Sequence, residues 1–147
     1  MDAIDQQLVA VLRADGRASY AELGRRVGLS GPSVQERVRR LEERGVLRGY
    51  HAAVDPVAVG LDVTALVGIY LSDNAAQDDV ARRLAGVHAI EDCWSVAGDE
   101  TFVVKIRVAD VAALEATIGQ LRRIRGIART RTTVVLSTRW EGRAAPS

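Results

Sequence analysis

The sequence predicts an α+β protein of two domains, a winged helix-turn-helix over residues 1–50 and a βαββαβ, ferredoxin-like domain over residues 63–140, joined by a linker over residues 51–62. Two observations lead to this prediction. Apolar residues recur at helical spacing in the first part of the chain, whereas strand-like and helical stretches alternate in the second. With 147 residues, 48% of them hydrophobic and 27% charged, the chain is long enough for two small domains and too apolar to be disordered. Residues 141–147 are expected to form a flexible tail.

Two helices are predicted at the start of the chain. The first spans residues 4–13, where apolar side chains recur every three or four positions, and it ends before Asp15. The second starts after Ser19, because Ser19 and Glu22 have the spacing of a capping box, and it ends at Gly28.

A third helix follows after a very short turn. Ser30 can cap its N-terminus, Pro32 occupies its first turn, where a missing N–H costs nothing, and Gly45 ends it. The helix places three apolar residues on one side, which we expect to be buried: Val34, Val38 and Leu41. Two helices joined by so tight a turn predict a helix-turn-helix.

The basic residues are concentrated around this motif. Residues 25–48 contain seven arginines and three glutamates, a net charge of +4 in a chain whose total is +1. A basic segment on an otherwise slightly acidic protein indicates a polyanion that binds one surface. In a helix-turn-helix the second helix lies in the major groove, so the sequence predicts that this domain binds double-stranded DNA.

Nine residues are predicted to contact DNA. Those near the N-terminus of the third helix are assigned to base edges: Ser33, Gln35, Glu36 and Arg37. Those better placed for the phosphate backbone are Arg25, Arg39 and Arg40, and Ser30 and Arg48 complete the set. An alternative stays open for each single arginine: the exposed face of a surface helix, with ion pairs between residues four apart such as Glu36 and Arg40.

The second half predicts alternating strands and helices. Residues 46–54 are expected to be extended, and Asp55-Pro56 begins a short helical turn closed by Gly60. Strands are then predicted over 64–71, 89–97, 102–108 and 128–138, with helices around 80–84 and between Asp110 and Gly126. Gly98 and Asp99 fall at a hairpin turn. This order is the βαββαβ of ferredoxin-like domains.

A four-stranded sheet with both helices on one side leaves its other face uncovered. We expect that face to carry Val67, Ile69, Val103 and Val135. An exposed apolar face of this kind usually binds a partner, and a homodimer through the sheets or their edges is the simplest solution.

The sequence predicts no catalytic, metal or cofactor site. His51 and His88, the two histidines, lie in different domains without Cys or carboxylate neighbours at ligand spacing, and Cys93 is the single cysteine. No stretch approaches about 18 uninterrupted apolar residues, and the N-terminus is acidic where a secretory signal would be basic. We therefore expect a cytoplasmic protein that is not an enzyme and has no membrane partner.

Eight short motifs, spread over both domains, are together characteristic of one family. They are Asp2-Ala-Ile-Asp5, Asp15-Gly-Arg17-Ala-Ser19, Glu22-Leu23, Val27-Gly-Leu-Ser30, Arg37-Val-Arg-Arg-Leu-Glu42, Gly45-Val-Leu-Arg-Gly-Tyr50, Val96-Ala-Gly-Asp99 and Gly126-Ile with Arg129-Thr-Arg-Thr132. With these motifs the sequence resembles the Lrp/AsnC, or feast/famine, family of bacterial and archaeal regulators over nearly its full length. The resemblance implies a transcription regulator that dimerises through its C-terminal, RAM-type domain, often as an octamer of four dimers around which DNA wraps. It also implies an effector, an amino acid or related metabolite, bound where dimers meet.

The resemblance places the effector beside two segments, Gly98, Asp99, Glu100 and Thr101, and Thr132, Thr133, Val134 and Val135. Where many members have Gly-Asp-aromatic-Asp, this chain has Glu100 and Thr101. An acidic side chain expected to face the effector's amino group is therefore lost or displaced by one position. We expect a weak response to simple aliphatic amino acids such as leucine. The alternative for Gly98 and Asp99 is a plain hairpin turn.

Two other functions stay open on the sequence alone. Sirohaem decarboxylases, which are enzymes, resemble the same family, although two distant histidines argue against a tetrapyrrole pocket. An architectural protein would wrap DNA without sensing any effector.

Overall fold

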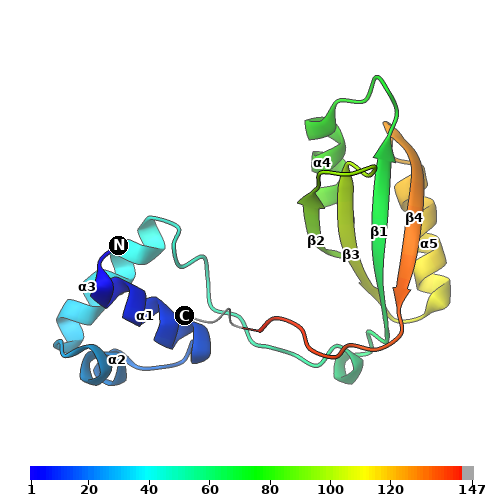
Figure 1. The fold of residues 1–147 in the computed structure, drawn as a ribbon. Helices are drawn as coiled ribbons and strands as arrows, with labels where there is room; N and C mark the ends of the chain where they lie inside the picture. Colours follow the sequence, from blue (N-terminus) through cyan, green and yellow to red (C-terminus); the bar gives the residue numbers. More distant parts are fainter. Residues whose placement is uncertain (144–147) are drawn as a thin grey trace. The chain divides into compact units, whose positions relative to one another are not determined.

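The computed structural model of the chain describes residues 1–143, so part of the predicted tail, residues 144–147, lies outside the described residues. The chain divides into two compact units, one of residues 1–53 together with 140–143, and one of residues 54–139. We call them the head and the sheet domain, and each is described by itself (Figure 1).

The head is built from three helices. They are α1 (Ala3–Ala14), α2 (Tyr20–Val27) and α3 (Gly31–Glu43). The predicted capping box at α2 is confirmed, because the Ser19 N–H donates to Glu22 Oε2 (2.8 Å) and the Glu22 N–H donates to Ser19 Oγ (3.2 Å). Ser30 caps α3 by accepting from the Ser33 N–H. Asp2 and Asp5 form a further capping box at α1, which we did not predict because Asp at the third helical position departs from the usual Glu or Gln.

Apolar residues from all three helices form the core of the head. The buried members are Leu8, Leu12, Leu23, Val34 and Val38. The turn between α2 and α3 is tight because Gly24 has no side chain: a Cβ there would collide with the carbonyl oxygen of Leu29. The helix-turn-helix is therefore held both by its core and by this close backbone approach.

One part of the head differs from the prediction. The segment expected to be extended, residues 46–54, contains no β-strand. Gly49 adopts a φ of 148°, and a Cβ at that position would lie 2.8 Å from Nε2 of His51. A single strand without a neighbour has no partner for its backbone hydrogen bonds, so apolar residues in this segment are not sufficient to form one.

The sheet domain has the predicted βαββαβ order and an antiparallel sheet. Its elements are a short 3₁₀ helix, η1 (Val57–Val59), then β1 (Val63–Leu71), α4 (Gln77–Ala85), β2 (Ile90–Ser95), β3 (Phe102–Val108), α5 (Val111–Arg122) and β4 (Ile127–Val135). The strand order across the sheet is β2-β3-β1-β4. Both helices cover one face (Figure 1), which confirms the α+β fold class and leaves the opposite face open. We call the opposite face the open face.

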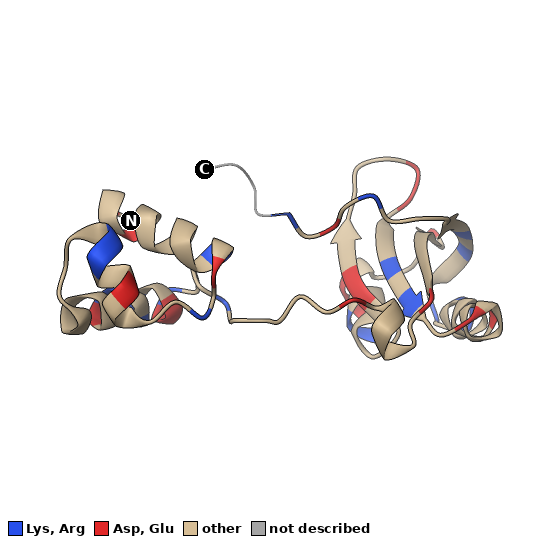
Figure 2. Ribbon diagram, turned by 90° about the horizontal axis from the view of Figure 1, so that it is seen from below, with Lys and Arg blue, Asp and Glu red and all other residues tan. Residues whose placement is uncertain are grey.

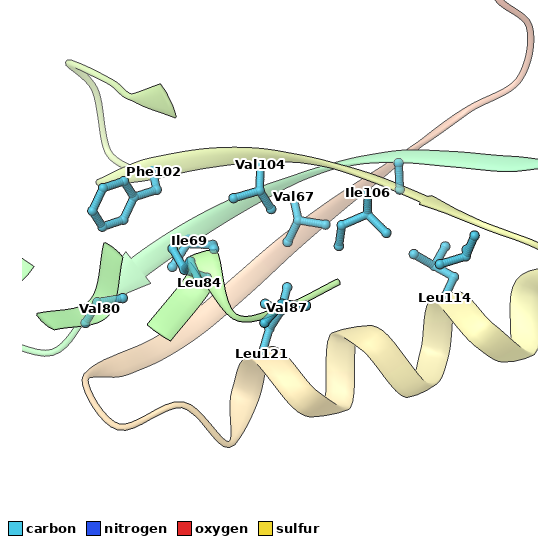
Figure 3. Close-up of a cluster of buried hydrophobic side chains, with 12 residues drawn as sticks. Val67, Ile69, Val80, Leu84, Val87, Phe102, Val104, Ile106, Leu114 and Leu121 are labelled. Atoms are coloured by element: carbon cyan, nitrogen blue, oxygen red, sulfur yellow. The ribbon is translucent and has the colours of Figure 1, made fainter. Parts of the chain in front are cut away.

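The core lies between the sheet and its two helices. It contains Val67, Ile69, Val104 and Ile106 from the strands and Val80, Leu84, Leu114 and Leu121 from the helices (Figure 3). Our assignment of Val67 and Ile69 to the open face is therefore wrong. Residues 63–71 are apolar on both faces, so alternation could not reveal which residues point inward. Val103 and Val135 do lie on the open face, since they pair with Gly68 and Thr64, which alternate with the buried residues of β1.

Candidate DNA interface and effector site

The helix α3 has the two faces that the sequence predicts. Its apolar stripe is buried: the exposed fractions of Val34, Val38 and Leu41 are 0%, 2% and 1%. Its other side presents exposed polar side chains, namely Ser33, Gln35, Glu36, Arg39, Arg40 and Glu43. Basic and acidic residues both occur on the helices of the head (Figure 2). The packing of the apolar stripe thus turns the predicted base-reading and phosphate-binding residues outward.

Ion pairs within α3 link several of these exposed charges. Nη2 of Arg39 lies 2.7 Å from Oε1 of Glu36, Nη1 of Arg39 contacts Glu43, and Nε of Arg40 lies 3.5 Å from Oε1 of Glu36. The Arg39 hydrogen bond lowers the pKa of Glu36 below its usual value. Each of these side chains is at least half exposed. Exposed pairs of this kind are weak, so the arginines can exchange a carboxylate for a phosphate.

Arg37 is placed differently from the rest of the set. Its Nη1 lies 2.7 Å from Oδ2 of Asp2 and 2.8 Å from Oδ1 of Asp5, both at the N-terminus of α1. Hydrogen bonds from the Asp5 backbone and from Arg37 lower the pKa of Asp2. The structure therefore shows Arg37 joining α3 to α1, a contact that we did not predict because it depends on how the two helices pack.

The remaining predicted DNA contacts are exposed. Ser30 lies at the start of α3, where its Oγ donates to Oγ of Ser33 (2.9 Å). Arg25 is exposed in the last turn of α2, and Arg48 is exposed beyond the end of α3. Tyr50, a residue missing from our predictions, donates its hydroxyl to Oε1 of Glu42 (2.8 Å) and so ties the chain beyond α3 to the end of that helix.

The predicted effector loop connects β2 to β3. The Val96 N–H donates to the carbonyl of Thr101 (3.1 Å), and the Thr101 N–H donates to the carbonyl of Ile69 (2.9 Å), so both ends of the loop are held. Gly98 does not adopt a positive φ. The backbone therefore does not require glycine at this position, and because the loop joins two antiparallel neighbouring strands, the hairpin-turn alternative stays open.

The side chain of Glu100 folds over β1. A Cβ added to Gly68 would lie 2.7 Å from Cγ and 3.1 Å from Oε1 of Glu100. Gly68 belongs to the open face, between Val103 of β3 and Arg131 of β4. The loop thus places a carboxylate above the open face, and Gly68 provides the space that this carboxylate occupies.

The second predicted effector segment lies along β4. Thr133 and Val135 belong to the open face, whereas Thr132 and Val134 pair with the buried residues Val67 and Ala65. Val135 pairs with Thr64, four residues from Gly68 along β1, which corresponds to about 13 Å. Thr133 pairs with Leu66, two residues or about 7 Å from Gly68, so within one chain a small ligand beside Glu100 can reach Thr133 but not Val135.

The open face also carries a cluster of ion pairs that sequence patterns did not reveal. Nζ of Lys105 lies 3.1 Å from Oε2 of Glu91 and 2.7 Å from Oδ2 of Asp92, and Nε of Arg107 lies 2.9 Å from Oε1 of Glu91. The register between β2 and β3 shifts between Ile90 and Asp92, so Glu91 is an extra residue in the strand. The shift allows two neighbouring carboxylates to reach the same side of the sheet.

Comparisons with known proteins agree with both halves of the chain. Residues 1–42 match the sequence profile of the AsnC-type helix-turn-helix domain, and residues 64–145 match that of the Lrp/AsnC ligand binding domain. The chain belongs to the Lrp/AsnC family. Its relatives include the HTH-type transcriptional regulator LrpA of Mycobacterium tuberculosis, 46% identical over 143 residues, which cover 97% of this chain and 95% of that protein. The Leucine-responsive regulatory protein of Escherichia coli is 38% identical over 141 residues, covering 92% of this chain and 85% of that protein.

Solved structures of the Lrp/AsnC family share the fold. A feast or famine regulatory protein from M. tuberculosis, complexed with L-methionine, matches with a TM-score of 0.91 and 45% identity over 97% of each chain. The predicted function is thereby confirmed: this Lrp/AsnC protein is a DNA-binding transcription regulator whose second domain binds a small-molecule effector. Its relatives are named as transcription regulators, which rules against the enzyme alternative. Among the described residues, no helix is both long enough and apolar enough to cross a membrane.

Proposed function

We propose that this Lrp/AsnC regulator works as a homodimer, and as a higher oligomer such as an octamer, whose heads bind half-sites of double-stranded DNA in the cytoplasm. An amino acid or related metabolite, bound beside Glu100, shifts its assembly or its affinity for DNA. A ligand changes such an equilibrium only through its different affinities for the two states.

The position of the Glu100 carboxylate is the observation that carries this proposal. A carboxylate accepts hydrogen bonds from an ammonium group, and the one on Glu100 lies over Gly68 on the open face. The relative complexed with L-methionine supports an amino acid as ligand. Because Val135 lies farther along the sheet than a small ligand beside Glu100 reaches, we propose that a second subunit supplies the part of the site that includes Val135.

The composition of the open face supports dimerisation through it. Leu66 and Trp94 are 39% and 47% exposed, and Val103 lies beside them on β3. The charges of Lys105 and Arg107 are already paired, so covering them leaves no unpaired cation. The exposed Arg131, also on this face, makes no ion pair within residues 1–143, so the paired charges are those around Lys105 and Arg107. A face with apolar side chains beside paired charges is suited to pack against a second copy of itself.

For DNA we propose two groups of contacts on α3 and its surroundings. Ser33, Gln35 and Glu36 read base edges, while Ser30, Arg25, Arg39, Arg40 and Arg48 hold the backbone. Arg37 was included among the base-reading residues, and its pairing with Asp2 and Asp5 supports instead a role in positioning α3 against α1.

Calorimetric titration with L-methionine tests the effector site. We expect saturable binding by the native protein, and affinity weakened about tenfold or more in Glu100→Gln, because a charge-assisted hydrogen bond is lost. Glu115→Gln is the matched control, since it neutralises an exposed carboxylate on α5, on the opposite side of the sheet from Glu100, and it should bind as the native protein does. Equal affinity in Glu100→Gln and the native protein would remove Glu100 from the site.

The residue after Glu100 gives a second test. Many family members have an acidic residue at the position of Thr101, whereas this chain has its acidic residue one position earlier, at Glu100. We therefore expect leucine to bind weakly to the native protein and more tightly to Thr101→Asp. Tight, saturable binding of leucine by the native protein, undiminished in Gly98→Trp, would show that both the ligand class and the pocket are misassigned.

A further inference from the structure

A hollow on the helix side of the sheet domain lies apart from the open face and its effector loop. It has a volume of about 380 Å³ and lies between the β1–α4 loop, the helix α4 and the turn from α5 to β4. Its lining includes Ser72 and Asn74 from the loop, Asp79 and Arg83 from α4, and Arg125 and Gly126 from the turn. This volume is in the range of small-molecule sites.

Contacts between distant parts of the chain hold the walls of the hollow. The N–H of Ser72 donates to the carbonyl of Gly126 (2.9 Å), and Oγ of Ser72 donates to the same oxygen (3.3 Å). Gly126 has a φ of 100°, and a Cβ there would lie 2.8 Å from Cγ2 of Val80 and 3.1 Å from Cβ of Ala75. The loop and the turn therefore approach each other closely around a glycine, and the hollow is formed before any ligand binds.

Two guanidinium groups line the hollow without a partner. Within residues 1–143, the side chains of Arg83 and Arg125 make no ion pair and no hydrogen bond, although nearby arginines do: Arg82 pairs with Asp79, and Nε of Arg122 donates to Oγ1 of Thr130 (3.4 Å). Since Asp79 is already paired with Arg82, the uncompensated charge in the hollow is positive. Two forked donors from separate elements match the geometry of a carboxylate or phosphate.

We propose that this hollow is a second ligand site, which binds the carboxylate or phosphate group of a small molecule. The surrounding charges favour a small anion over the DNA backbone. Two exposed aspartates are next to lining residues in the chain: Asp73 lies between Ser72 and Asn74, and Asp78 precedes Asp79. These carboxylates repel a polyanion lying across the rim, whereas one anionic group inside the hollow contacts the arginines directly.

The proposal is tested by melting the full-length protein in increasing inorganic phosphate, with sodium chloride at equal ionic strength as the reference. Phosphate should raise the melting temperature saturably, because a ligand that binds only the folded state stabilises it. Arg83→Gln and Arg125→Gln should each weaken the apparent affinity about tenfold or more. Arg83→Lys should retain more of it, since the charge is kept while the fork is lost.

Arg139→Gln provides the matched control. It removes the same charge from the same domain at a position away from the hollow. The hollow lies at the start of β4, next to Gly126, whereas Arg139 follows the end of that strand. We expect its phosphate response to equal that of the native protein. A native response in Arg125→Gln, an equal loss in Arg139→Gln, or the same stabilisation by chloride would each overturn the proposal.

DNA binding by the same variants separates the two sources of phosphate. For a small-molecule site, Arg83→Gln and Arg125→Gln should leave the salt dependence of DNA affinity unchanged. If either variant flattens the dependence of log affinity on log salt by roughly one unit, the hollow contacts the DNA backbone and the small-molecule proposal is wrong.

Discussion

The two regions of the molecule hold their charges in different ways. On α3, Arg39 and its partners Glu36 and Glu43 are each at least half exposed. On the open face of the sheet, the side chains of Lys105 and Arg107 are only 17% and 5% exposed, and they pair with Glu91 and Asp92. An exposed charge exchanges partners at little cost in free energy, because water solvates it in between. Removing the partner of a buried charge destabilises the folded protein, because the remaining charge is left without solvent or partner. The head is therefore suited to exchange carboxylates for phosphates, and the sheet to keep its pairs.

Separating the two regions should have the largest effect. We expect residues 60–147 expressed alone to stay dimeric, and residues 1–50 alone to be monomeric and to bind DNA feebly. Two heads reach two half-sites about one helical turn of DNA apart, or a multiple of it, only when a dimer sets their spacing. Light scattering on each fragment measures the assembly state, and a monomeric sheet fragment would contradict the proposed role of the open face.

Removing a charge from the open face should cost folding stability. For Arg107→Ala we expect the free energy of unfolding to fall by about 2 kcal/mol, below the value for a fully buried pair because Glu91 is partly exposed. Urea denaturation measures the change. Arg39→Ala is the control, because it removes an arginine whose ion pairs are exposed, and it should leave the free energy of unfolding nearly unchanged. Equal losses of stability in the two variants would remove the distinction between the regions.

Removing charges from the head should instead affect DNA affinity. Replacing both Arg39 and Arg40 by Ala should weaken binding to every sequence about equally and flatten the dependence of log affinity on log salt by roughly one unit per lost contact. Gln35→Ala should relax base preference at one half-site position, at roughly 1–3 kcal/mol for a good contact. Binding measured at several salt concentrations tells the two effects apart, and an unchanged slope in the double variant would exclude the phosphate assignment.

The smallest expected effect is at the contact between α1 and α3. The backbone hydrogen bond from Asp5 and the hydrogen bond from Arg37 lower the pKa of Asp2 in the folded protein from its usual value of 3.8, so the ionised Asp2 stabilises the head above that value. This contribution to stability is lost below about pH 4, as the pH falls through the lowered pKa of Asp2 and its carboxylate becomes protonated. Melting temperatures over this range should fall less steeply for Asp2→Asn than for the native protein. Identical slopes would show that the ionisation of Asp2 is not coupled to folding.

The structure corrected the sequence analysis at residues whose environment depends on distant parts of the chain. Val67 and Ile69 were assigned to the wrong face because neither face of residues 63–71 carries a charged residue, and only the packing of α4 and α5 selects the buried side. The pairing of Arg37 with Asp2 and Asp5 joins residues more than 30 positions apart. The Glu91 cluster follows from a shift in register between two strands, for which the sequence carries no recognisable signal.

Local chemistry in the sequence was enough to determine the helices of the head, the order of strands and helices, the apolar and polar faces of α3 and the family. Capping residues such as Ser19 and Ser30, and the alternation of residues 102–108, act over a few neighbouring positions and can be read without knowing the fold. Only the tertiary structure decided that Glu100 lies over Gly68 and that Arg83 and Arg125 line one hollow. Those residues are separated by 25 or more positions, and hydrogen bonding and packing of the whole sheet domain bring them together.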